Sequence, residues 1–249
     1  MSFNVEKTTT EIIEWIKNYF EENGKTCNAI IGISGGKDST VCAALLVKAL
    51  GANRVIGVTM PDGTQSDLSD SFKVIEILSI NHVHVNIGNA KNELMKEVEN
   101  AIKESGLAKE VKADTKINMP PRLRMTTLFA VSQTLNGRVV NTCNLSENWI
   151  GYSTLFGDAA GQFSPLGNLT VKEVIEIGKH IGLPVELVEK KPSDGLCGKT
   201  DEDNIGFTYD ELDNYIRTGE KGENFEKINE LHLKNMFKLK PMPHYKPDI

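Results

Sequence analysis

The apolar residues of the chain follow two different spacings. Four short segments are either nearly continuous in apolar residues or alternate between apolar and polar ones. Short apolar runs with turn residues at their ends predict strands buried on both faces, as in parallel sheets. We therefore expect strands at residues 28–33, 54–60, 82–87 and 139–142.

Between these segments, apolar residues recur three and four positions apart, which predicts helices. One of these helices is expected to start at Pro120-Pro121. Polar or glycine-rich stretches at 108–117, 144–168 and 190–204 predict loops, and we expect the last of them to be mobile. The predicted helices cover residues 8–22, 39–50, 66–79, 89–105, 122–135, 171–181, 209–217 and 223–237.

This alternation of strands and helices predicts a doubly wound parallel sheet of the Rossmann-like α/β class, flanked by helices. In such a fold, ligands bind in the crevice at the carboxyl ends of the strands. Residues that directly follow a strand are therefore the candidates for chemistry. The 249 residues fit one domain, 1–249, which ends in a proline-broken basic tail at 238–249.

The composition is that of an ordinary globular protein, with 39% hydrophobic and 25% charged residues. The formal net charge of −6 argues against broad binding to nucleic acid or to a membrane surface, and no apolar run is long enough to span a bilayer. The four cysteines show no Cys-x-x-Cys spacing, and scattered thiols suit a reducing compartment. Because the N-terminus also lacks the apolar core of a signal peptide, we expect a cytoplasmic protein.

A glycine-rich segment, Ser-Gly-Gly-Lys-Asp-Ser at residues 34–39, directly follows the first predicted strand. Two glycines let backbone N–H groups close around an anion, and the N-terminus of the following helix adds partial positive charge. The segment is not a Walker A motif, because Lys37 is followed by an aspartate. Asp38 would repel a bare phosphate, but it becomes useful if Mg²⁺ lies between them. A simple glycine turn with Asp38 as a helix cap is the alternative.

The segment resembles the pyrophosphate-binding loop of the ATP pyrophosphatases, which split ATP between its α and β phosphates and adenylate a substrate. That resemblance implies the adenine nucleotide alpha hydrolase-like variant of the α/β fold. Downstream segments are similar to those of one branch, the NAD synthetases. They are Asn118-(x)3-Arg-x-Arg-Met, Asn141-Thr-(x)4-Glu, Gly151-Tyr-(x)4-Gly-Asp-(x)2-Gly and Lys191-Pro-Ser-(x)7-Asp-Glu-(x)3-Gly-(x)2-Tyr-Asp.

The resemblance covers nearly the whole chain and, since no glutaminase segment is present, it indicates the form that uses free ammonia. It implies that the carboxylate of deamido-NAD (nicotinic acid adenine dinucleotide) attacks the α-phosphate of ATP. Pyrophosphate leaves, and ammonia then converts the adenylated intermediate to NAD and AMP. The implied partners are these small molecules and a second copy of the chain in a homodimer.

The implied catalytic and metal-binding residues are Asp38 and Glu147, which follow two predicted strands and can meet at the crevice. Two carboxylates with phosphate oxygens and water make an ordinary Mg²⁺ shell. For Glu147 alone, a solvated loop acid is the alternative. The resemblance implies ATP contacts at Gly32, Ile33, Ser34, Gly35, Gly36, Lys37, Asp38, Ser39, Thr142, Lys172 and Ser193, and deamido-NAD contacts at Arg122, Asp158 and Lys238.

Several of these residues also have purely structural interpretations. Thr142 could simply end a strand, Asp158 could be a turn residue and Ser193 a plain loop serine. Met60 could lie against adenine or in the core, and Arg124 could pack or form a salt bridge.

The sequence departs from the family pattern at three places. Leu155 stands where the family has a substrate-contacting lysine, and Val171 where it has a phosphate-contacting lysine. Lys172 lies one step further on, but one residue turns a side chain by about 100° around a helix, so it is not an automatic replacement. Lys37, Lys190 or Lys191 could supply the missing charge. In the tail, Phe237-Lys238 matches a His-Lys pair only at its lysine.

Two other functions are compatible with parts of the sequence. Another adenylating enzyme with the same loop would share the first motif, but a sulfur-transferring one would need paired cysteines and GMP synthetase an additional C-terminal domain. A non-catalytic nucleotide-binding module would explain the lost lysines. It would not explain why both acids of a magnesium pair are present.

Overall fold

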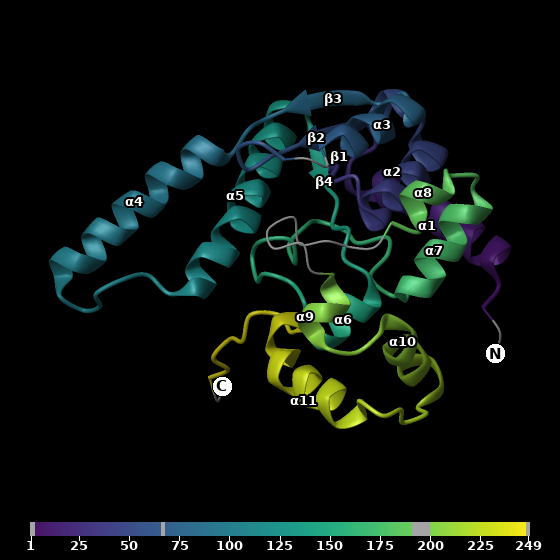
Figure 1. Ribbon diagram of the computed structural model, residues 1–249. Coiled ribbons are helices and arrows are strands. Elements are labelled where there is room, and N and C mark those ends of the chain that lie inside the picture. The colour runs from purple at the N-terminus through teal and green to yellow at the C-terminus, as the bar shows by residue number, and fades with distance from the viewer. Residues whose placement is uncertain (1–2, 66–67, 191–199, 248–249) are drawn as a thin grey trace.

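The computed structural model describes residues 3–65, 68–190 and 200–247 of the protein (Figure 1). Its centre is a parallel four-stranded sheet in the order β3-β2-β1-β4. The strands are β1 (Asn28–Gly32), β2 (Val55–Thr59), β3 (Asn81–His84) and β4 (Gly137–Val139). The strand order reverses direction between β1 and β4, which places a crevice at their carboxyl ends.

Helices cover both faces of the sheet, so the prediction of a doubly wound α/β fold is confirmed. Ala29 and Ile31 of β1 face a core filled by one group of helices, whereas Ile30 faces a second core with Met125 and Leu128. This two-sided burial explains the continuous apolar run of the strand. The first group is α1 (Val5–Asn23), α2 (Lys37–Leu50), α3 (Leu68–Leu78), α7 (Val171–His180) and α8 (Val185–Val188), and the opposite face carries α5 (Ala113–Thr134).

The C-terminal part of the chain forms a smaller helical layer below the sheet (Figure 1). Its apolar side chains make a separate cluster that includes Ile150, Leu212 and Ile228. The helices of this layer are α6 (Leu145–Ile150), α9 (Asp201–Ile205), α10 (Tyr209–Thr218) and α11 (Phe225–Asn235), followed by the 3₁₀ turn η2 (Met236–Leu239). No described helix is both long and apolar enough to cross a membrane.

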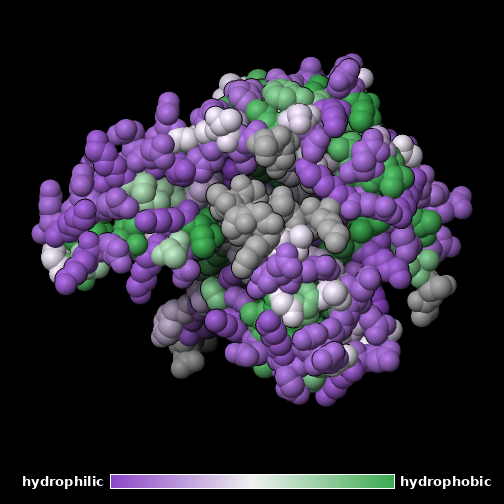
Figure 2. Space-filling view, in the orientation of Figure 1, coloured by the Kyte–Doolittle hydropathy of each residue, from purple (hydrophilic) through white to green (hydrophobic). Residues whose placement is uncertain are grey.

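Helix α4 (Gly88–Ser105) and the first half of α5 project from the body as an arm (Figure 1). The prediction of a loop over 108–117 is wrong from Ala113 on, because α5 starts there and continues through Pro120 and Pro121. A proline removes a backbone donor but keeps a helical φ, and the Asn118 amide donates to the Asp114 carbonyl nearby. The surface of the arm is largely hydrophilic, with separate hydrophobic residues between (Figure 2).

The remaining differences from the prediction concern element boundaries and helical residues inside predicted loops. Strand β3 ends at His84 because its neighbour β2 ends at Thr59, and β4 ends at Val139 after pairing with β1. The predicted loops at 144–168 and 190–204 contain α6 and the start of α9, and residues 191–199 of the second lie outside the described residues.

Candidate active site

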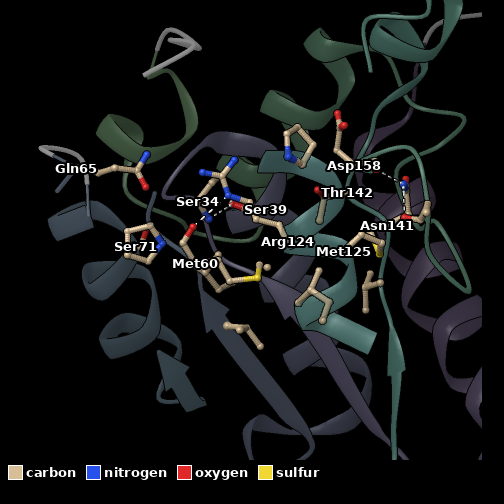
Figure 3. A pocket seen from close by; sticks show the side chains of 18 of the residues that line it. Ser34, Ser39, Met60, Gln65, Ser71, Arg124, Met125, Asn141, Thr142 and Asp158 are labelled. Atoms are coloured by element: carbon tan, nitrogen blue, oxygen red, sulfur yellow. Dashed lines mark hydrogen bonds between the residues drawn. The ribbon is translucent and has the colours of Figure 1, made fainter. Parts of the chain in front are cut away.

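A cavity of about 400 Å³ lies at the carboxyl ends of β1, β2 and β4. Gly32 at the end of β1 and Ile33 after it line the cavity, as do Met60 after β2 and Thr142 after β4 (Figure 3). Helix α5 closes one side with Met125 and Leu128, among other residues. The cavity therefore lies where the parallel sheet predicts a ligand crevice.

The glycine loop turns from β1 into α2 at the edge of this cavity. Gly35 has a φ of +78°, and a Cβ there would lie 2.9 Å from both the Asp70 Cβ and the Ser71 backbone nitrogen, so only glycine fits. The Ser34 and Ser39 hydroxyls lie 3.1 Å apart and both line the cavity. Helix α2 begins without a side-chain cap on its first N–H groups. Uncapped N–H groups at a helix start are a suitable anion site.

Asp38 and Glu147 are brought together by the side chain of Asn144, which was not among the predicted site residues. The Asn144 amide donates to Asp38 Oδ1 over 3.0 Å, and its oxygen accepts from the Glu147 backbone N–H over 3.0 Å. The Asn144 N–H in turn donates to Glu147 Oε2 over 3.2 Å. Asn144 is fully buried. The Asn-x-x-Glu spacing of a helix capping box was the available signal for this arrangement.

Lys37 is the cation next to this acid pair. It is only 3% exposed, and its Nζ donates to Asp38 Oδ2 over 2.9 Å. Burial opposes the charge of Lys37, yet the carboxylates of Asp38 and Glu147 raise its pKa overall. Burial and the nearby Asp38 charge together raise the pKa of Glu147 to about 8, against the opposing effect of Lys37.

The acid pair fits a hard divalent cation. Asp38 and Glu147 offer carboxylate oxygens that Asn144 holds on one side of the glycine loop. Within the described residues, Glu147 Oε1 accepts no hydrogen bond, and burial together with the Asp38 charge raises the pKa of Glu147. The described part of the chain contains no group of three His, Cys, Asp or Glu that could hold a metal. A Mg²⁺ ion here would therefore complete its shell with phosphate and water.

Two further residues, which the sequence indicates only as parts of a motif, stand close to the acid pair. Asp201, at the start of α9, is 9% exposed and accepts from the Tyr152 hydroxyl over 3.3 Å. The Tyr209 hydroxyl is buried and has no hydrogen-bond partner among the described residues. Burial, together with the charges of Glu147 and Asp201, raises the pKa of Tyr209. No local sequence pattern indicates that Asp201 and Tyr209 lie near the acid pair, because their positions depend on how α9 and α10 pack.

The cavity brings together several other predicted contacts. Thr142 and Asp158 line it, as does Arg124, whose Nε donates to the Met60 carbonyl over 3.1 Å (Figure 3). Asp158 is open to the cavity but enclosed by protein on its other sides, and this partial burial raises the pKa of its carboxyl group. Its Oδ1 accepts from the Thr154 N–H over 2.8 Å.

Other predicted residues lie outside the cavity lining. Arg122 is exposed and donates to the Leu155 carbonyl over 3.2 Å. The Lys238 ammonium donates to the Gly151 and Ser153 carbonyls over 2.7 and 2.9 Å.

The predicted phosphate contacts beyond the glycine loop also lie outside this lining. Lys172 is exposed, and its backbone N–H donates to Asp213. Ser193 and Lys191 lie outside the described residues. Val171 is buried, and Lys190 pairs with Asp70 over 2.6 Å. Of the two alternative lysines that the structure describes, Lys37 is the one beside the acid pair.

A parallel sheet with a glycine turn after its first strand, a cavity at the strand ends and a linked carboxylate pair beside it define a class of nucleotide-binding α/β enzymes. Comparison with known proteins identifies the family within this class. The chain belongs to the NAD synthase family, whose sequence profile matches residues 8–244. The family resemblance seen in the sequence is thereby confirmed.

Individual relatives agree with this assignment. A protein named NH(3)-dependent NAD(+) synthetase from Carboxydothermus hydrogenoformans is 36% identical over 88% of this chain and 88% of its own. The structure of an NMN synthetase from Francisella tularensis matches with a TM-score of 0.88 and 30% identity, covering 100% of both chains. An NH3-dependent NAD synthetase from Campylobacter jejuni, at 23% identity and a TM-score of 0.78, covers 99% of this chain and 100% of its own and supports the fold.

Proposed function

We propose that the protein is a ligase that amidates the pyridine carboxylate of deamido-NAD with ammonia, coupled to the cleavage of ATP. The products are NAD, AMP and pyrophosphate. The observation that carries this proposal is the Asp38–Asn144–Glu147 linkage beside an uncapped glycine loop and an adenosine-sized cavity. A binding module for adenosine alone would not need a pair of acids held at this position. The names of the 34–38% identical relatives support the same reaction.

In this mechanism the residues of the chain bind and orient. The cavity takes the adenosine, and the loop N–H groups with the Ser34 and Ser39 hydroxyls hold the phosphates. Mg²⁺, held by Asp38 and Glu147, would neutralise charge as one anion attacks another. The substrate carboxylate attacks the α-phosphorus and pyrophosphate leaves. Ammonia then attacks the acyl carbon, its extra proton is lost, and AMP leaves.

The direct test is turnover by the purified protein. Incubation with ATP, MgCl₂, ammonium chloride and deamido-NAD should yield NAD, AMP and pyrophosphate in equal amounts, resolved by chromatography. Formation of ADP would mean cleavage at a different phosphate. Absence of turnover with every pyridine nucleotide would favour a non-catalytic nucleotide-binding module.

A second candidate substrate is nicotinic acid mononucleotide, whose amidation gives NMN by the same chemistry. The Francisella tularensis NMN synthetase aligns with this chain over its full length. In addition, Leu155 takes the place of a substrate-contacting lysine in the family pattern, so one cation that could meet the larger dinucleotide is missing. The two substrates should be compared by kcat/KM in the same assay. A higher value for the mononucleotide would assign the protein to NMN synthesis.

We also propose that the active form is a cytoplasmic homodimer. The projecting arm of α4 and α5 exposes Leu94, Leu107 and Ile117, which are 44%, 85% and 57% accessible, and a second copy is the occupant we expect. Light scattering coupled to size exclusion should give twice the chain mass of 27.5 kDa. The Leu107→Glu and Ile117→Glu double variant should give the monomer mass.

A further inference from the structure

Lys37 occupies a position that is unfavourable for a cation. It is the first residue of α2, where the partial charge of the helix N-terminus is positive. It is also 97% buried, and an ammonium group is strongly hydrated in water. A lysine persists in such a place only if nearby negative charge compensates for both effects.

That compensation comes from the proposed metal site. The Lys37 Nζ contacts Asp38 Oδ2 at 2.9 Å, and the other acids whose charge acts on it are Glu147 and Asp201. The Nζ lies 5.9 Å from the centre of the Tyr209 ring. Within the described chain, Lys37 is the only salt-bridge partner of Asp38. One buried cation therefore faces three acids.

We propose that Lys37 is an internal counter-cation that competes with Mg²⁺ for Asp38 and Glu147, and so sets the affinity of the site for the metal. The inference rests on the proposed function, because it assumes that these two acids bind Mg²⁺. When the metal is absent, Lys37 balances part of their charge. When the metal is present, the ammonium group stands beside a divalent ion in an enclosed site, where like charges repel strongly.

The contacts of Lys37 fit competition with Mg²⁺ better than a role in helping the two acids to bind it. Asn144 already fixes the orientation of Asp38 through Oδ1 and holds Glu147 through its cap, so Lys37 is not needed to aim either carboxylate. Lys37 instead contacts the other oxygen, Asp38 Oδ2, which Asn144 leaves free for a cation. The neighbouring glycine loop offers the ammonium group a new anionic partner once a triphosphate is bound.

The test is direct binding of MgCl₂ to the full-length protein by isothermal titration calorimetry. Lys37→Met removes the charge and keeps an unbranched side chain, and it should bind Mg²⁺ about tenfold or more tightly than wild type. Lys37→Arg keeps the charge and should stay near wild type. Lys48→Met, an exposed lysine at the other end of α2, is the matched control and should change nothing.

A thermal melt provides a second readout that does not depend on activity. In chelator, Lys37→Met should unfold at a lower temperature than wild type, because its acids are uncompensated. Added MgCl₂ should raise its melting temperature by more than that of wild type. A variant that folds only with Mg²⁺ supports the proposal in the same way.

The outcomes also separate this inference from the proposed function. Equal or weaker Mg²⁺ binding by Lys37→Met, with wild type binding normally, overturns the role of Lys37 and leaves the reaction intact. If neither wild type nor Lys37→Met binds Mg²⁺, both the proposed metal site and the role of Lys37 are overturned. If wild type shows no turnover but Lys37→Met still binds Mg²⁺ more tightly than wild type, only the proposed reaction is overturned.

Discussion

Asn144 shows how much one buried side chain contributes at the residue scale. Its amide oxygen caps α6 and its amide nitrogen donates to Asp38, so it sets the distance between two acids that are 109 positions apart, from 38 to 147. The loop serines, the cap and the ion pair of Lys37 are each ordinary interactions. Together they place two acids and a buried lysine beside the glycine loop.

The acids themselves can be tested by truncation. Asp38→Ala and Glu147→Ala should each abolish pyrophosphate release, because the attack of one anion on another needs the charge neutralisation that the proposed metal would supply. Circular dichroism should show that both variants remain folded. Normal turnover in either variant would remove that residue from the metal site.

Asn144 can be tested by separating its two roles. Asn144→Ser keeps an oxygen for the helix cap but loses the donor to Asp38, whereas Asn144→Ala loses both. We expect turnover and Mg²⁺ affinity to fall about 10- to 100-fold in the serine variant. The alanine variant should lose about 1 kcal/mol more stability through the missing cap. Full turnover in the serine variant would show that Asn144 only caps the helix.

At the scale of elements, the edge strand β3 is tied to the cavity through shared polar contacts. The buried Thr59 hydroxyl contacts His82 Nε2 at 2.9 Å and His84 Nδ1 at 2.8 Å, and Met60 of the cavity follows directly. Phe72 of α3 packs against both imidazole rings. The strand that forms the edge of the sheet therefore supports one wall of the site.

The surroundings of His82 make the stability of the fold depend on pH. Burial, with a contribution from His84, lowers the pKa of His82 below its ordinary value of 6.5. The unfolded chain then binds more protons than the folded one just below pH 6.5, so stability should fall as the pH drops through that window. Melting temperatures from pH 7.5 to 5.5 should show a shallower decline for His82→Gln. His244→Gln, in the exposed tail, is the control, and an unchanged slope in His82→Gln would contradict the assignment.

The elements show which features a sequence can predict. The spacing of apolar residues predicts the elements that pack into a core, because burial of one or both faces requires apolar residues at regular positions. These elements are β1, β2, α1, α2, α7 and α10. The start of α5 does not, since its first half is in the exposed arm and carries two prolines. Asp38 and Glu147 could be paired because parallel strands end at one edge. Asp201 and Tyr209 could not, because their approach depends on the packing between distant helices.

For the whole molecule, the C-terminal turn η2 contacts the loop that leads to Asp158. The Lys238 ammonium in η2 ties the Gly151 and Ser153 carbonyls, which lead to Asp158 in the cavity. Partial burial lowers the Lys238 pKa, with Asp158 opposing that effect. The C-terminal layer is thus connected to the sheet through the loop that carries a predicted substrate contact.

Loss of this connection should weaken substrate binding. Lys238→Met should raise KM for the pyridine nucleotide several-fold, with a smaller effect on kcat, because the loop before Asp158 loses two charge-assisted hydrogen bonds. Lys240→Met, two residues further along the exposed tail, is the matched control. Equal KM values in the two variants would show that Lys238 has no influence on the site.

The helices that carry Asp38 and Glu147 pack into different hydrophobic cores. Asp38 lies on α2, which packs into the core on one face of the sheet, and Glu147 lies on α6, which packs into the C-terminal cluster. An ion bound by both would cross-link the two halves. Calorimetric unfolding in chelator should then separate into two transitions that merge on metal addition. The ion proposed for the reaction would in that case also make the protein unfold as a single cooperative unit.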